Sequence, residues 1–169
     1  MAFSPLADVE VHSLADLKPE WFRENGIRLM LLDFDNTVVP YTTNIPTEAF
    51  NTWLRETRAA GVTVAVVSNS HSSRVQTFCA EREIPCTIRA RKPSPRGLMD
   101  AMEKLGFAPE ETAMAGDQSF TDVLAGNFAG VTTVLVYPIA FSNPLFRVRY
   151  WIELPFIHFA RRKRKNSGR

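Results

Sequence analysis

The sequence is poor in features that would place it in several other classes of protein. It has only two cysteines in 169 residues, Cys79 and Cys86, too few for a disulfide framework or a zinc pattern. We therefore expect a reducing compartment and two small buried side chains. The first 17 residues carry acidic side chains and no basic cluster, which argues against a cleaved secretion signal. These absences predict a cytoplasmic protein.

The sequence also lacks both glycine-rich loops that bind nucleotides. Neither G-x-x-x-x-G-K-[ST] nor G-x-G-x-x-G occurs among its 8 glycines, so neither a P-loop nor a dinucleotide-binding Rossmann turn has support. No internal repeat and no low-complexity segment is present. Hydrophobic residues make up 45% of the chain and charged residues 22%, which is typical of one globular domain with an ordinary core.

Five short apolar runs alternate with segments whose apolar residues recur at helical spacing. This alternation is typical of an α/β protein with a doubly wound, mainly parallel sheet in a three-layer sandwich. Right-handed crossovers would place the carboxyl ends of the strands, and the loops after them, along one edge. The predicted strands are residues 27–32, 62–67, 86–90, 112–115 and 131–136, and the predicted helices are residues 47–60, 72–83, 94–105 and 119–129.

Two acidic residues directly follow the first predicted strand. Asp33 and Asp35 stand behind the apolar run Leu29–Leu32, at the edge where ligands bind in open α/β sheets. Both carboxylates cannot be buried without a cation, because an unpaired buried carboxylate is destabilising or takes up a proton. Hard oxygen ligands suit Mg²⁺, which would also recruit phosphate. A simpler interpretation is a turn in which Asn36 and Thr37 cap the next element.

Polar side chains also follow the other predicted strands. Ser68 and Asn69 come after the second strand, Lys92 after the third, and Asp117 and Asp122 after the fourth. On a parallel sheet these residues converge on one crevice with the acidic pair. The set offers a nucleophile, countercharge for phosphoryl oxygens and a proton donor, which are the requirements of phosphoryl transfer. Taken singly, each motif is also explained as a helix cap, a surface lysine or a turn.

This ordered set of motifs resembles the haloacid dehalogenase superfamily, whose members are mostly Mg²⁺-dependent phosphatases that act through an aspartyl-phosphate. The resemblance covers about residues 27–140. It implies that Asp33 is the nucleophile and that Asp35 protonates the leaving alkoxide and then activates water. Dehalogenases lack an acid at the position of Asp35, so its presence favours phosphomonoester hydrolysis. A receiver-like domain shares the parts in another order: its acidic pair ends the first strand, its phosphorylated aspartate ends the third, and its lysine comes last. Here the third predicted strand ends in basic residues, and the acidic pair of Asp117 and Asp122 comes last.

The resemblance assigns roles to the remaining polar residues as well. Ser68 and Lys92 are implied to bind phosphate, and the lysine charge offsets those of the nucleophile and the phosphoryl group. The ligands implied for Mg²⁺ are the carboxylates of Asp33 and Asp117, the backbone carbonyl of Asp35, and Asp122 directly or through water. Further substrate-binding residues are expected at Asn36, Thr37 and Asn69.

The spacing of the motifs bears on the substrate. Asp35 and Ser68 are 33 residues apart, and Ser68 and Lys92 are 24 apart, which leaves no room for a cap domain. An open crevice favours a substrate that is large or is presented by a surface. Within the superfamily the chain looks most like the small bacterial YqeG-type phosphatases of subfamily IIIA, a group similar to the mitochondrial phosphatidylglycerophosphate phosphatase. The resemblance therefore implies a phospholipid head group; nucleic-acid 3′-phosphate ends and small phosphomonoesters are alternatives.

The segment 144–169 differs in charge from the rest of the chain. It holds eight basic residues and one acid, a net +7, against −5 for residues 1–143, which we predict to be the phosphatase domain. Its aromatic part is too polar and too interrupted to span a bilayer. It could make peripheral contact with an anionic membrane, pack on the domain, or bind nucleic acid. The alternative to an enzyme is a non-catalytic module that binds nucleic acid or the ribosome through this tail.

Overall fold

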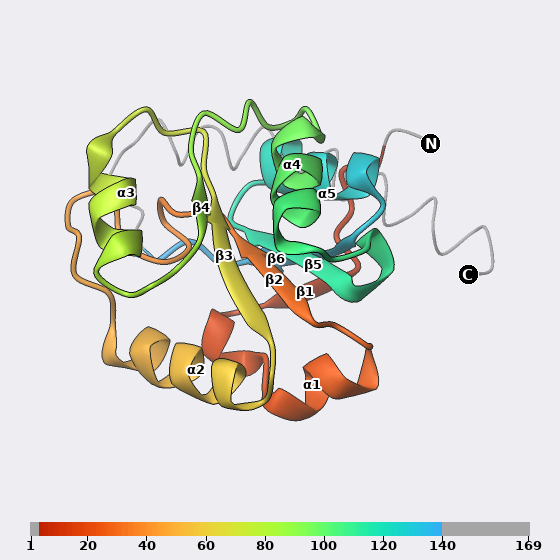
Figure 1. The fold of residues 1–169 in the computed structure, drawn as a ribbon, viewed down its shortest axis with the longest axis horizontal. Helices are drawn as coiled ribbons and strands as arrows, with labels where there is room; N and C mark the ends of the chain where they lie inside the picture. Colours follow the sequence, from red (N-terminus) through yellow and green to blue (C-terminus); the bar gives the residue numbers. More distant parts are fainter. Residues whose placement is uncertain (1–3, 140–169) are drawn as a thin grey trace.

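The sheet is the centre of the fold. A computed structural model describes residues 4–139, so the predicted tail lies outside the described residues and the division at residue 143 stays a prediction. The sheet has six strands in the order β1-β6-β5-β2-β3-β4, and every pairing is parallel (Figure 1). The strands are β1 (Val9–Val11), β2 (Leu29–Leu32), β3 (Thr63–Val67), β4 (Cys86–Thr87), β5 (Thr112–Gly116) and β6 (Thr132–Val136).

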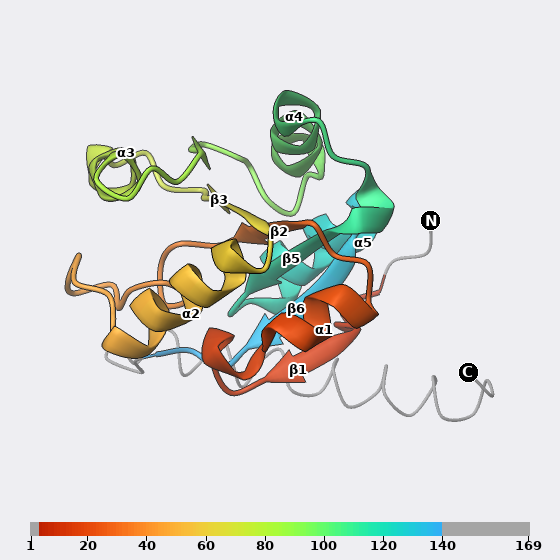
Figure 2. The same cartoon turned by 60° about the horizontal axis from the view of Figure 1, so that its bottom comes forward.

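Helices lie on both sides of the sheet, which confirms the predicted doubly wound α/β fold. Helices α1 (Pro19–Glu24) and α2 (Glu48–Ala59) lie on one side, and α4 (Arg96–Leu105) and α5 (Leu124–Ala129) lie on the other (Figure 2). Helix α3 (Ser73–Ala80) contacts β4 and packs into the same apolar cluster as α2. Short 3₁₀ segments span Leu14–Asp16 and Pro109–Glu111, and a π-helical turn spans Ser119–Val123.

Local sequence explains why these elements begin and end where they do. Thr47 caps α2, because its Oγ1 accepts a hydrogen bond from the Phe50 amide at 3.1 Å. Gly106 caps the carboxyl end of α4 directly after Leu105, with a φ of 76° that suits glycine. All four residues of β2 are buried, since the strand is central and has helices on both faces. The chain therefore leaves a fully buried strand at Asp33.

The described part of the chain contains no inserted cap domain and no membrane-spanning helix. Between β2 and β3 lie one loop and α2, and between β3 and β4 lies α3. Over residues 4–139, every helix is too short or too polar to cross a bilayer. The carboxyl edge of the sheet therefore stays uncovered by a second folded unit within these residues.

The edge strands differ most from the sequence-based expectation. The predicted strand 86–90 is shortened to Cys86–Thr87, because Arg89 and Arg91 have φ values of 55° and 58° and turn the chain out of the ladder. Cys86 is exposed, so the prediction of two buried cysteines was wrong for this one; Cys79 is buried. Strand β4 lies at the edge of the sheet with β3 as its neighbour, so its side chains are less covered than those of a central strand. Strand β1 and helix α1 were not predicted.

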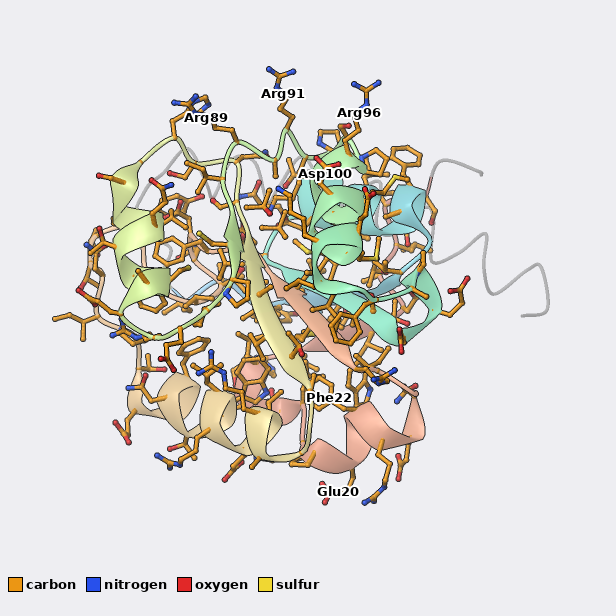
Figure 3. All side chains as sticks on the ribbon, in the orientation of Figure 1. Glu20, Phe22, Arg89, Arg91, Arg96 and Asp100 are labelled. Carbon is orange, nitrogen blue, oxygen red and sulfur yellow. The ribbon has the colours of Figure 1, made fainter. Side chains whose placement is uncertain are left out.

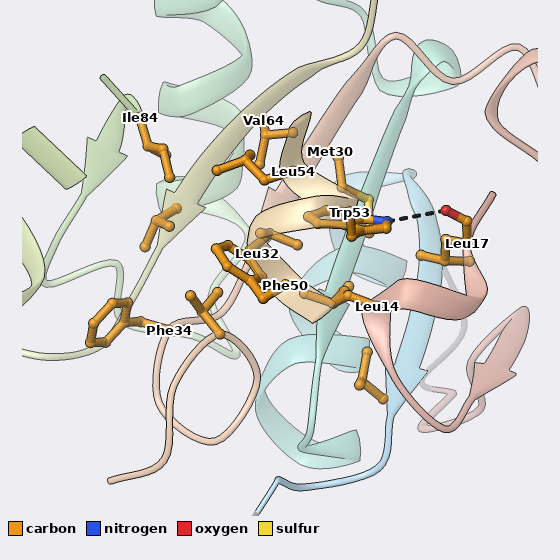
Figure 4. Close-up of a cluster of buried hydrophobic side chains, with 14 of the residues drawn as sticks. Leu14, Leu17, Met30, Leu32, Phe34, Phe50, Trp53, Leu54, Val64 and Ile84 are labelled. Carbon is orange, nitrogen blue, oxygen red and sulfur yellow. Dashed lines mark hydrogen bonds between the residues drawn. The ribbon is translucent and has the colours of Figure 1, made fainter. Parts of the chain in front are cut away.

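A buried hydrogen bond joins α2 to the segment before α1. The Trp53 Nε1 donates to the Leu17 carbonyl at 3.1 Å inside the apolar cluster (Figure 4). Trp53→Phe leaves that carbonyl without its donor, so we expect a loss of about 1–3 kcal/mol in the free energy of unfolding. Denaturant titration measures this loss. Trp21→Phe is the matched control, because no hydrogen bond from that indole is found within the described residues. An equal loss of unfolding free energy in both variants would contradict the explanation.

Candidate active site

The carboxyl edge of the sheet holds an ion cluster built around one buried lysine. The Lys92 Nζ donates to Asp33 Oδ1 at 2.7 Å, to Asp122 Oδ1 at 2.8 Å and to the Val67 carbonyl at 2.7 Å. All three ammonium protons therefore have acceptors. Burial disfavours the lysine charge, but the Asp122 and Asp33 carboxylates more than offset this and raise the pKa of Lys92. The lysine is a fixed positive charge at the end of β2 and β3.

A third carboxylate makes the cluster suitable for a metal ion. Asp33, Asp117 and Asp122 each place a carboxylate oxygen within 4.8 Å of the others. Burial, followed by the Asp122 and Asp33 charges, raises the pKa of Asp117 to about 8. The buried Asp117 Oδ1 has no hydrogen-bond partner among residues 4–139. One lysine cannot neutralise three carboxylates, so the donor set fits a hard divalent cation such as Mg²⁺.

Asp117 and Asp122 do not lie in the same environment. Asp122 Oδ1 contacts Lys92, and Asp122 Oδ2 accepts from the Gln118 amide at 3.1 Å. Asp117 is less constrained, as its partnerless Oδ1 shows. This geometry favours Asp117 as the direct ligand and Asp122 as a support that orients Lys92 and the Gln118 turn.

Asn69 and Ser68 lie beside the lysine, on the loop after β3. Asn69 Oδ1 accepts from the Lys92 amide at 2.7 Å, and its Nδ2 donates to the Lys92 carbonyl at 2.9 Å. Both polar atoms of this side chain therefore position Lys92, and the predicted substrate contact stays a prediction. Ser68 is buried, and its Oγ accepts from the Ser70 amide at 3.1 Å. It follows Val67, whose carbonyl binds the Lys92 ammonium.

Asp35 has a partner that the sequence did not indicate. Arg74, in the first turn of α3, donates from Nη2 to Asp35 Oδ1 and from Nη1 to the Tyr41 carbonyl at 3.0 Å. Its guanidinium also lies over the Phe34 ring, 5.1 Å from the centroid. Burial raises the pKa of Asp35, and Arg74 opposes that shift. The only sequence signal for this contact was one arginine within a predicted helix.

Asn36 and Thr37 form the turn that follows the acidic pair. Asn36 is buried with a φ of 64°, a conformation that asparagine tolerates better than most residues. Its amide donates to the Val39 carbonyl at 2.7 Å. Thr37 is buried, and its Oγ1 has no hydrogen-bond partner in the described part of the chain. The turn directly follows Asp35, and substrate binding by these two residues stays a prediction.

Gly116 lets β5 pass close to the acid of the π-helical turn. A Cβ added at Gly116 would lie 2.3 Å from the Asp122 carboxyl carbon. Gly116→Ala must displace Asp122, so we expect a loss of about 1–3 kcal/mol in unfolding free energy. We also expect a fall in the phosphatase activity predicted from the sequence, because Asp122 contacts Lys92 at 2.8 Å. Denaturant titration and a phosphate-release assay measure both. Gly130→Ala is the control, because an added Cβ there meets no neighbour and only the positive φ is unfavourable. The prediction is wrong if Gly130→Ala loses as much activity as Gly116→Ala.

A parallel α/β sheet binds ligands at its carboxyl edge, and the three carboxylates and one buried lysine found there suit phosphoryl transfer. A family model described as haloacid dehalogenase-like hydrolase matches residues 18–130, more than half of the chain. The chain belongs to the haloacid dehalogenase-like hydrolases. The predicted family, with its enzyme class, is confirmed.

Two curated relatives are consistent with this family. The chain is 33% identical over 138 residues to "Probable phosphatase YqeG" of Bacillus subtilis (strain 168), covering 82% of this chain and 80% of that protein. It is 31% identical over 154 residues to the chloroplastic/mitochondrial phosphatidylglycerophosphate phosphatase 1 of Arabidopsis thaliana, covering 85% of this chain but only 44% of that protein. The protein is an enzyme of the phosphatase class, and the alternative of a non-catalytic module is not favoured.

Solved structures share the fold at low sequence identity. The cobalt-bound deoxy-D-mannose-octulosonate 8-phosphate phosphatase of Haemophilus influenzae is 20% identical with a TM-score of 0.54, covering 76% of this chain and 77% of that one. A hypothetical protein from Xanthomonas campestris is 19% identical with a TM-score of 0.50, covering 80% and 74%. These likenesses concern the architecture alone.

Proposed function

We propose that this phosphatase is a Mg²⁺-dependent phosphomonoester hydrolase that works through an aspartyl-phosphate on Asp33. The observation that carries the proposal is the contact of Asp33 with Lys92 at 2.7 Å, inside a cluster that also contains Asp117 and Asp122. A nucleophile needs its own charge offset before it can approach an anionic phosphoryl group. The contact of the Lys92 ammonium with Asp33 supports this role for the lysine.

The proposed reaction has two steps, both at Asp33. An Asp33 carboxylate oxygen attacks phosphorus, the bond from phosphorus to the ester oxygen breaks, and Asp35 donates its proton to the leaving alkoxide. Asp35 then takes a proton from a water molecule as that water attacks the phosphoryl group, which releases inorganic phosphate and restores Asp33. Lys92 and Ser68 bind the phosphoryl oxygens. The raised pKa of Asp35 supports its role as the proton donor.

The carboxylates of Asp33 and Asp117 and the backbone carbonyl of Asp35 would hold Mg²⁺, with Asp122 in support. When bound, Mg²⁺ supplies positive charge that neutralises the phosphoryl oxygens in the transition state. The cluster itself contains three carboxylates and one lysine, so the cation also relieves repulsion among the acids. We therefore expect Mg²⁺ to raise the midpoint of thermal unfolding, and chelation to lower it.

A lipid-borne phosphomonoester is the substrate class that we propose. No cap domain lies between the strands of the described chain, so a head group anchored in a surface has access to the crevice. The Arabidopsis relative is named for phosphatidylglycerophosphate. Nothing in the described geometry requires a small enclosed metabolite. Peripheral membrane contact and a place in phospholipid metabolism follow from this proposal.

Hydrolysis of p-nitrophenyl phosphate with added Mg²⁺ and with excess chelator tests the reaction. We expect release of phosphate with the metal and loss of release on chelation. A substrate panel then tests the class, with phosphatidylglycerophosphate in vesicles, a sugar phosphate and a 3′-phosphorylated oligonucleotide. Metal-independent turnover would contradict the proposed mechanism. A larger kcat/KM for the sugar phosphate or the oligonucleotide would leave the mechanism standing and refute the lipid substrate.

A further inference from the structure

Three exposed arginines stand at the carboxyl edge of the sheet, outside the site described above. Arg89 and Arg91 lie between β4 and Lys92, and Arg96 is the first residue of α4. Figure 3 shows all three side chains pointing away from the body of the protein on one side, with Glu20 of α1 on the opposite side. We call Arg89, Arg91 and Arg96 the rim arginines. They line a groove of about 490 Å³ between β4 and α4.

The rim arginines have no partner that explains their position. None of their guanidinium groups makes a hydrogen bond or an ion pair within the described residues. The same groove contains one more cation, Lys104, and one acid, Asp100, so four basic side chains face a single carboxylate. Such a surplus gives this edge a positive potential that attracts anions.

The backbone holds two of the rim arginines in place. The Arg89 amide donates to the Ser70 carbonyl at 3.2 Å, and the Ala90 amide donates to the Ser68 carbonyl at 3.0 Å. Arg89 and Arg91 both have a left-handed φ, which is unfavourable for a side chain with a Cβ. These bonds tie the rim segment to the loop that carries Ser68. The backbone at these two arginines is therefore held next to the loop that follows β3, which carries Ser68.

The arrangement fits an extended anionic surface better than a single anion. One phosphate is bound by side chains that converge on it, whereas Figure 3 shows the three rim arginines pointing outward from separate places along the edge. Single-stranded nucleic acid binds through stacked aromatic side chains as well as charge. Within residues 4–139 the exposed large hydrophobic side chains include one aromatic, Tyr137, and it lies in a different groove.

We propose that the rim arginines dock the protein on the anionic head groups of a lipid bilayer, with the carboxyl edge of the sheet facing the membrane. This inference rests on the proposed function, because Asp33 follows β2 and the rim arginines follow β4, at the same edge of a parallel sheet, where a lipid-borne phosphomonoester has to enter. It is independent of the tail, since it concerns described residues of the domain. Docking by this edge brings the head group to Asp33 without extraction of the lipid from the bilayer.

Vesicle sedimentation of the full chain tests the docking surface without any turnover. The probe is phosphatidylcholine vesicles with and without phosphatidylglycerol, at low and high salt. Each basic residue near an anionic surface contributes about 1 kcal/mol, so Arg89→Gln, Arg91→Gln and Arg96→Gln together should weaken partitioning on the order of a hundredfold. The difference in partitioning between the wild type and this variant should be smaller at high salt, where surface charges are screened.

A matched control changes charge equally on the opposite side of the protein. Lys18→Gln, Arg23→Gln and Arg55→Gln remove three exposed cations on and next to α1 and α2. We expect this variant to partition as the wild type does. A second variant, with all three rim arginines changed to lysine, should retain partitioning within a few-fold because it keeps the charge. Circular dichroism and the unfolding midpoint of each variant check that the domain is folded.

Several results would overturn the proposal. One is failure of the wild-type chain to bind phosphatidylglycerol vesicles, and another is equal binding by the glutamine rim variant and the control variant, which would assign docking to other residues. Binding of a single-stranded oligonucleotide that depends on the rim arginines, without vesicle binding, would assign the surface to nucleic acid. Absence of phosphatase activity with intact rim-dependent vesicle binding would refute the proposed function and leave the docking surface standing.

Discussion

Asp33→Asn is expected to abolish metal-dependent phosphatase activity while the fold survives. Loss of a catalytic nucleophile lowers kcat by roughly 10⁴- to 10⁶-fold in enzymes whose catalytic groups act as a unit. An amide cannot form the acyl phosphate that the carboxylate would form, and it is a poorer ligand for a hard cation. A continuous assay with p-nitrophenyl phosphate and Mg²⁺ measures the loss.

The structure explains why this variant should stay folded. Asp33 is one of three crowded carboxylates; burial is the main cause that raises the pKa of both Asp117 and Asp122, and the Asp33 charge adds to it. The amide removes that repulsion, and Lys92 keeps its contact with Asp122 at 2.8 Å. The unfolding midpoint without metal should therefore remain close to that of the wild type. Glu110→Gln makes the same chemical change at an exposed position and should keep full activity. Metal-dependent activity of Asp33→Asn above about one hundredth of wild type would refute Asp33 as the nucleophile.

Lys92→Met is expected to destabilise the protein more than any other change at the site. Methionine has a similar length but no charge, so Asp33 and Asp122 would remain buried without their cation. Removal of one partner from a buried ion pair costs roughly 3–5 kcal/mol of unfolding free energy. Activity should also fall by about 10²- to 10³-fold, as for other single donors to a transition-state oxyanion. Denaturant titration and the phosphate-release assay measure the two effects.

The loss of stability in Lys92→Met should depend on pH in a defined direction. The pKa of Lys92 is raised in the folded wild type, so its contribution is complete at neutral pH and is lost only as the pH rises through that pKa. In the variant the remaining charges are carboxylates, and a carboxyl with a raised folded pKa destabilises the fold above its unfolded pKa. The loss of unfolding free energy in the variant should therefore be smaller at about pH 5 than at about pH 8. Lys18→Met, at an exposed position, should lose neither stability nor activity. A loss of stability in Lys92→Met that does not change with pH would contradict the explanation.

The position of the site could be predicted from the sequence because parallel sheets place polar residues in order along one edge. The apolar run Leu29–Leu32 marked a buried strand, and the polar residues after each run then had to meet. Distances could not be predicted. The ion pair of Arg74 with Asp35 depends on where α3 lies relative to the loop after β2, and one arginine in a helical pattern carries no information about that.

Two further features depend on tertiary structure rather than on local pattern. Asn69 binds the backbone of Lys92 because β3 and β4 are neighbours in the sheet, although 23 residues separate the two positions. The segment Val9–Val11 is too short to show a strand period by itself, and it becomes a strand through its pairing with β6. The predicted helix 119–129 begins instead with a π-helical turn, in which the Val123 amide donates to the Gln118 carbonyl at 3.3 Å.

The pairing of β1 with β6 has a consequence for synthesis of the protein. Val9 aligns with Val134, so the first strand of the described chain finds its neighbour only in the last one. A ribosome makes residue 9 well before residue 134, and long-range parallel pairing is slow to form. During translation the β1 segment therefore has to wait, unpaired, until nearly the whole domain has emerged. Nascent chains arrested before β6 should be cut by protease near the first strand, and chains arrested well beyond it should resist.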